Sequence, residues 1–168
     1  MTLTPRRASS AVICSVLSSL IMVALMSGSP PSQAGDALHW KDAWVRSMPP
    51  AAQVTAAYGQ LMNHGDEMIT ITGVTSTVGG EAQMHDVIAE GDQRRMTPLT
   101  SVEIAPGETL TFQPGGRHIM LLDVVDPPLE GSQVELCALS ELGNRACTQA
   151  PIERQAPATQ NAHTGHHH

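Results

Sequence analysis

Turn-forming pairs such as Pro-Pro, Gly-Gly and Pro-Gly divide most of this chain into short segments. The segments between the turns are β-branched or alternate apolar and polar residues, which is typical of strands. The predicted strands span residues 43–46, 54–62, 69–76, 83–89, 109–112, 118–125, 134–140 and 146–152. No long segment has a helical period. We therefore predict an all-β protein with a single domain, an antiparallel β-sandwich.

Residues 1–34 have the layout of a secretory signal peptide. Arg6 and Arg7 precede a long apolar stretch, and small residues follow it at a suitable cleavage site. We expect cleavage between Ala34 and Gly35. The mature chain would then be exported to an oxidising compartment outside the cytoplasm.

A membrane anchor is the alternative interpretation of the same stretch. Ser15, Ser18 and Ser19 interrupt the apolar run, which falls short of the roughly 20 residues that a spanning helix needs. Cys14 lies inside this run and not at a cleavage point, so a lipoprotein is not expected. We predict no membrane insertion once the signal peptide is removed.

The mature chain is acidic. Loss of residues 1–34 removes two arginines and no acidic residue, so the formal net charge changes from −7 to −9. Because such a surface repels phosphate backbones and anionic lipid, nucleic acid is excluded as a partner.

Cleavage also removes Cys14 and leaves Cys137 and Cys147. Exported thiols do not stay reduced, so this even number predicts a disulfide. A hairpin that folds at Leu142 would set the two cysteines opposite each other on paired strands, within reach of a cross-strand bridge. A redox-active or metal-binding role for the pair is the alternative.

Two segments offer an imidazole and a thioether on one face of the predicted sheet. His118 and Met120 are two residues apart on a strand, so their side chains point the same way. A hairpin folded at Glu90-Gly91 would set His85 opposite Met96, again on a shared face. The alternative is that the methionines fill the core and the histidines are only hydrogen-bonded.

Two imidazoles and two thioethers suit few metals. Thioether sulfur selects Cu(I) over zinc, magnesium or manganese, and imidazole suits copper in both oxidation states. Methionine is also not lost to disulfide formation, as a cysteine ligand would be outside the cytoplasm. We predict a Cu(I) site at His85, Met96, His118 and Met120, whereas Met84 faces the other side of its strand and packs. Neutral ligands on a surface release metal readily, which favours delivery over catalysis.

The spacing of these four residues, H-x10-M-x21-H-x-M, resembles that of the periplasmic copper chaperones called PCu(A)C. Further matches are Ala43-Trp44-Val45-Arg46, Ala57-Tyr58, Asn63 and Pro114-Gly115-Gly116-Arg117 ahead of His118. The resemblance implies a cupredoxin-like fold, a periplasmic location and the same four copper ligands. It also implies delivery of copper to respiratory cytochrome oxidase. The expected partner is the oxidase subunit that holds copper, or another copper chaperone, docked transiently.

The strand pattern stops after Ile152, so we place the sandwich domain at residues 35–153 and a flexible tail at residues 154–168. The tail contains four histidines: His163, His166, His167 and His168. Imidazoles without sulfur suit Cu(II), and we predict a second copper site there. Inert disorder or the remnant of an expression tag is the alternative.

Three alternatives to a copper chaperone can be compared on these grounds. An enzyme is disfavoured because the chain has no Gly-rich phosphate loop, no Gly-x-Ser-x-Gly motif and no evident pair of catalytic carboxylates. A structural or adhesive sandwich would leave the His and Met residues as packing. A thiol-redox assistant in oxidase assembly is disfavoured because the two cysteines do not form a C-x-x-C motif. The sequence therefore favours a copper chaperone.

Overall fold

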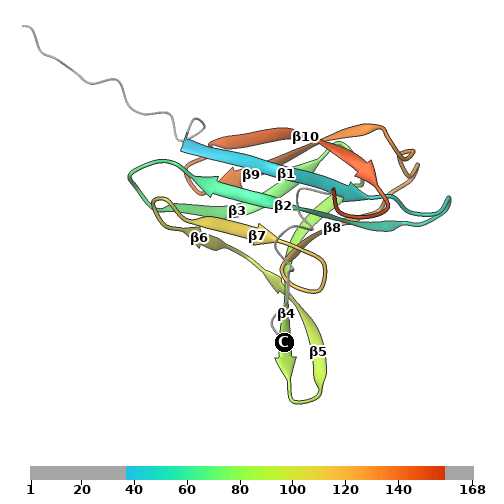
Figure 1. Cartoon of the computed structure of the whole chain (residues 1–168), viewed down its shortest axis with the longest axis horizontal. Helices are drawn as coiled ribbons and strands as arrows, with labels where there is room; N and C mark the ends of the chain where they lie inside the picture. Colours follow the sequence, from blue (N-terminus) through green and yellow to red (C-terminus); the bar gives the residue numbers. More distant parts are fainter. Residues whose placement is uncertain (1–36, 158–168) are drawn as a thin grey trace, which may run out of the picture. The chain divides into compact units, whose positions relative to one another are not determined.

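The computed structural model describes residues 37–157 (Figure 1). The all-β prediction is confirmed, since the regular elements of this part of the chain are ten strands. They are β1 (Leu38–Arg46), β2 (Val54–Asn63), β3 (Ile69–Ser76), β4 (Glu81–Glu90), β5 (Gln93–Leu99), β6 (Val102–Ile104), β7 (Thr109–Phe112), β8 (His118–Leu122), β9 (Gln133–Ser140) and β10 (Arg145–Glu153). The predicted signal peptide and the four tail histidines lie outside the described residues. Between residues 37 and 157, no helix has the length and apolar character needed to cross a membrane.

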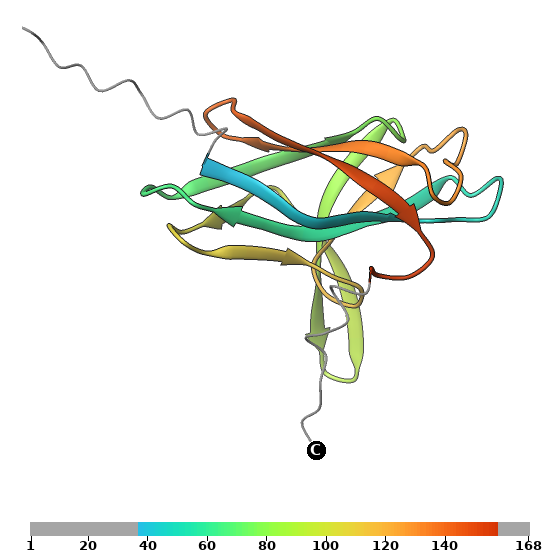
Figure 2. The same cartoon turned by 45° about the horizontal axis from the view of Figure 1, so that its top comes forward.

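The strands follow the order β5-β4-β8-β2-β1-β10-β9-β3-β6, and β7 pairs with β2. Figures 1 and 2 show this path folding back on itself, so that β3, β9 and β10 form a layer against β1 and β2. The predicted antiparallel sandwich needs one refinement. β1 and β10 join the two layers as a parallel pair, with Val45 opposite Ile152 and Arg46 opposite Glu153.

The core lies between the two layers. It is formed by every second residue along the strands, the one whose side chain points inward. Trp40 of β1 is buried against Phe112 of β7, and its Nε1 donates a hydrogen bond of 3.0 Å to the carbonyl of Ala146 on β10. In β8, Ile119 and Leu121 are fully buried. Because side chains alternate along a strand, this burial turns the residues between them outward.

The β4–β5 hairpin projects away from the sandwich (Figure 1). Its predicted register was wrong: His85 pairs with Pro98, and Met96 pairs with Val87. The turn is Gly91-Asp92, one position later than expected, and Gly91 has a φ of +62°. A type II′ hairpin turn requires glycine at its first central position, which explains the shift.

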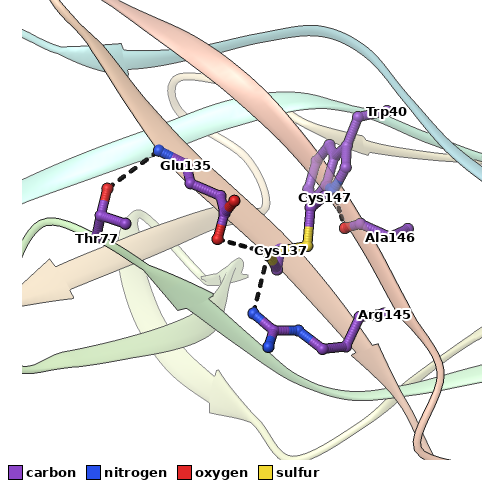
Figure 3. The surroundings of a disulfide bond; sticks show 7 residues. All are labelled: Trp40, Thr77, Glu135, Cys137, Arg145, Ala146 and Cys147. Atoms are coloured by element: carbon purple, nitrogen blue, oxygen red, sulfur yellow. Dashed lines mark hydrogen bonds between the residues drawn. A yellow bond between two sulfur atoms is a disulfide. The ribbon is translucent and has the colours of Figure 1, made fainter.

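The predicted disulfide is confirmed, and so is the predicted pairing of the two cysteines. Cys137 lies directly opposite Cys147 in the β9–β10 ladder, and the two form a disulfide with Cα atoms 4.0 Å apart (Figure 3). Arg145 Nη2 donates to Cys137 Sγ at 3.3 Å, and Glu135 Oε1 lies 3.6 Å from the same sulfur. The carboxylate and the two sulfurs are close enough for a metal site. Disulfide sulfur is not a thiolate, however, so this group does not offer the ligands that a metal needs.

Removing the disulfide tests whether it is a structural link. Replacing both Cys137 and Cys147 by serine should lower the free energy of unfolding by about 2–3 kcal/mol, because the bridge closes a short loop in the unfolded chain. Urea denaturation of the oxidised protein and of the double variant measures this difference. Equal stability of the two proteins would contradict a structural role.

Candidate metal centre

Three of the four predicted ligands meet where β4 pairs with β8. His85 lies directly opposite His118, and their ring centroids are 5.9 Å apart. Met120 follows two residues later on β8, opposite Gln83. All three ligand side chains are half-buried on the outward face of the sheet.

Met96 reaches the same face from β5. Its partner Val87 is two residues from His85, so Met96 is a diagonal neighbour of His85, about 7–8 Å away at Cα. The register error moved the partner of His85 by two positions, which leaves every side chain of β5 on its predicted face. The side chain of Met96 is 54% exposed, which makes it the most accessible of the four. Met84, in contrast, is buried in the core as expected.

The ring of His118 is oriented by the backbone. Its Nδ1 lies 2.8 Å from the carbonyl oxygen of Gly116. A carbonyl can only accept, so Nδ1 carries the proton and Nε2 keeps its lone pair. A hydrogen bond of this kind fixes the tautomer and direction of a histidine that binds a metal.

The ring of His85 is oriented by a side chain. Its Nε2 lies 3.0 Å from Gln83 Oε1, and Gln83 Nε2 donates in turn to Glu81 at 2.8 Å. Nδ1 of His85 then carries the lone pair, and this atom is buried without a hydrogen-bond partner. An unsatisfied buried polar atom costs about 1–3 kcal/mol, and a bound metal ion would remove that cost. The donor set therefore fits a metal.

The electrostatics of the site also favour a neutral ring for His85. Burial lowers the pKa of His85, and the neighbouring His118 lowers this pKa further. Neutral imidazole is the form that binds a metal. The described ligands carry no negative charge, which matches the preference of a soft monovalent ion.

One ion pair holds the two ligand strands together beside the rings. Arg117 Nη2 lies 3.2 Å from Asp86 Oδ2, and each residue immediately neighbours one of the histidines. This ion pair was not predicted from the sequence, and neither were the supporting roles of Gln83 and the Gly116 carbonyl. These residues lie only one or two positions from a histidine in the sequence. Which of them face the rings, however, follows only from the β4–β8 register.

The sequence comparisons match proteins that are described as putative lipoproteins. The model of the family described as "Putative lipoprotein LpqE-like" matches residues 38–152. The chain is 26% identical over 165 residues to "Putative lipoprotein Lxx21020" of Leifsonia xyli subsp. xyli, covering 96% of this chain and 98% of that protein.

Solved structures share the fold. A copper-bound PCuAC domain from PmoF2 matches with a TM-score of 0.59 and 21% identity, over 71% of this chain and 94% of that one. Apo-DR1885 from Deinococcus radiodurans matches with a TM-score of 0.56 and 20% identity, over 92% and 97%. The solution structure of CuI-DR1885 matches at 26% identity with a TM-score of 0.51, over 67% and 76%. These matches confirm the resemblance to PCu(A)C domains.

The protonation of His85 in the metal-free protein tests the described environment. We expect its ring to titrate below 6.5, the ordinary histidine value. The unfolded chain then binds more protons between the two pKa values. His85 therefore contributes stability that is present above pH 6.5 and lost as the pH falls through the folded pKa. NMR titration of the ring protons measures the pKa.

The variant His118→Gln separates the two causes of this shift. It should raise the pKa of His85, because a neighbouring charge is removed, but leave it below 6.5, because burial is the larger cause. A His85 ring that titrates at or above 6.5 in the wild type would contradict the environment described.

Proposed function

The chain belongs to the LpqE-like family, and from this membership and its fold we propose that it is an exported copper carrier. It binds one Cu(I) through His85, Met96, His118 and Met120. The observation that carries the proposal is the pair of half-buried imidazoles of His85 and His118, 5.9 Å apart between ring centroids, of which His85 Nδ1 is buried without a hydrogen-bond partner. The copper-bound state of the structural relatives supports the choice of metal.

The ligand set suits uptake and release. All four groups are neutral, so copper can leave without stranding a buried charge. Three ligands are half-buried on the β4–β8 ladder, and Met96 is exposed on the hairpin that projects from the sandwich. We infer that Met96 is the first ligand to be exchanged for a ligand of a partner protein, because it is the most accessible.

The proposed recipient is a copper centre of respiratory cytochrome oxidase or another copper chaperone, reached by transient docking in the periplasm. The spacing shared with PCu(A)C chaperones supports this recipient. The role is that of a carrier and not of an enzyme, since the four ligands would saturate a copper ion with no position left for a substrate.

Two alternatives remain distinct from this proposal. A structural or adhesive sandwich would use the four ligands only for packing, but Met96 is largely exposed. A thiol-redox assistant would act through Cys137 and Cys147, which lie on β9 and β10, away from the strands that hold the copper ligands. The geometry favours copper donation over both.

Export is supported by the lipoprotein descriptions of the family and of the relative. We propose that the mature chain starts near Gly35. Attachment of lipid at Cys14 is the alternative that those descriptions suggest, and the mass of the mature N-terminus distinguishes the two.

A pair of methionine variants tests the copper site. Met96 and Met68 are similarly exposed, at 54% and 57%, but only Met96 belongs to the site. In an anaerobic Cu(I) titration against a competing chelator, the wild type should bind one Cu(I) tightly. Met96→Leu should weaken this binding at least tenfold, because a soft ligand is lost, and the matched control Met68→Leu should not.

The same titration with His118→Gln should show a loss at least as large, because an oriented imidazole is removed. Wild-type affinity in both Met96→Leu and His118→Gln would refute the four-ligand site and leave the structural alternative.

The tail gives a separate prediction. We propose that His163, His166, His167 and His168 bind Cu(II), because their donor set has no sulfur. Deleting residues 160–168 should lower the number of Cu(II) ions bound, measured by equilibrium dialysis, and leave the tight Cu(I) site intact. An unchanged Cu(II) count would contradict the tail site.

A further inference from the structure

A second group of imidazole and thioether side chains lies at the other end of the β1–β2 ladder. His39 on β1 is directly opposite Met62 on β2. The flanking residues Leu38 and Trp40 are buried in the core. Alternation along the strand therefore turns His39 and Met62 to the outward face, where His39 is exposed and Met62 is half-buried.

His64 joins this pair from just beyond the end of β2. Its backbone N–H donates to the carbonyl of Ala37 at 2.7 Å, which continues the β1–β2 ladder by one further pair. His64 is therefore two positions from Met62 on the same face and diagonal to His39. The rings of His39 and His64 are 6.5 Å apart between centroids, and both residues are exposed.

The backbone under His64 is held by a buried amide. Asn63 is 1% exposed, and its Nδ2 donates to the carbonyls of Glu67 at 2.7 Å and Ile104 at 2.9 Å. Its Oδ1 accepts a hydrogen bond of 2.9 Å from the N–H of Gly65. These bonds fix the backbone on either side of His64, and the β1–β2 ladder fixes the backbone of His39.

The spacing of the two rings suits a shared metal ion. Imidazole nitrogens bind metals at about 2.0 Å, which places the two ring centroids about 5–6 Å apart. The observed 6.5 Å is close to this range and close to the 5.9 Å of the His85–His118 pair. Rotation of exposed side chains between nearby conformations closes the difference.

The donors themselves select the kind of metal. Among residues 37–157, no carboxylate or cysteine joins the two rings in a close group of three. The set is therefore two imidazoles and one thioether, all neutral, which favours Cu(I) over zinc or a hard divalent cation. We propose that His39, Met62 and His64 form a second Cu(I) site, filled after the first because its imidazoles are more exposed.

The two sites lie on one face of the sheet but cannot share an ion. Met120 is opposite Ala56 on β2, and Met62 is six positions further along that strand. At about 3.3 Å per residue, the separation is about 20 Å. The second site therefore stands independently of the first, and the chain has room for two Cu(I) ions on its folded domain.

Methyl NMR of the full chain, labelled at the methionine methyl groups and titrated anaerobically with Cu(I), reports on each site separately. The methyl signals of Met96 and Met120 should shift with the first equivalent of Cu(I), and that of Met62 with the next. The three candidate ligands do not include a tail residue, so a shift of the Met62 signal that depends on His39 and His64 distinguishes this site from copper bound by the tail histidines alone.

Two double variants serve as matched controls. In His39→Gln/His64→Gln, the shift of the Met62 signal should need at least tenfold more Cu(I). The signals of Met96 and Met120 should shift at the same Cu(I) concentration as in the wild type. In His85→Gln/His118→Gln, the Met62 shift should persist. Backbone amide spectra show whether each variant is folded, and the single variants His39→Gln and His64→Gln replace a double variant that is not.

Two results would overturn the second site. One is a Met62 signal that does not move at three equivalents of Cu(I), and the other is a shift that survives loss of both His39 and His64. Failure of the first site looks different, since Met96 and Met120 would then stay unmoved while Met62 responds.

Discussion

The pairing of β8 with two neighbours is the constraint on which the candidate copper site depends. β8 lies between β4 and β2, and its Ile119 and Leu121 are fully buried. Each buried side chain of this size contributes about 1.5–3 kcal/mol to stability. Turning either residue outward would lose that contribution, so His118 and Met120 have only the outward face left. The packing of the core therefore sets the direction of these two side chains.

The alternation of strand residues was predictable, and so were most strands. Eight of the ten strands appear in the sequence pattern, and the pairing of Cys137 with Cys147 follows from symmetry about Leu142. The predicted face of Met96 was also right, because a change of two positions in register preserves parity. These features depend on local periodicity, which a sequence displays directly.

Register and edge strands were harder to predict. β5 is exposed along most of its length and contains Pro98, so it lacks the apolar pattern of a buried strand. The group at His39 was not identified because the predicted strand began at residue 43, whereas β1 extends back to Leu38 beyond a bulge, with Asp42 at a φ of +51° and a register shift before Trp44. A bulge adds a residue to one strand only, and counting along the sequence cannot locate it. The supports of the histidine rings likewise depend on pairs that only the register reveals.

The position of the β4–β5 hairpin affects more than access to Met96. β5 ends the strand order and pairs with β4 alone, and a two-stranded hairpin has little stability of its own in water. An ion that engages Met96 therefore restrains a strand that is held by a neighbour on one side only, and part of the binding free energy offsets the lost chain entropy. In the proposed copper site, this cost lowers the affinity for the ion without weakening any single metal–ligand bond. Substitutions in the turn at Gly91-Asp92 would therefore change the dissociation rate of the ion while the four ligands stay the same.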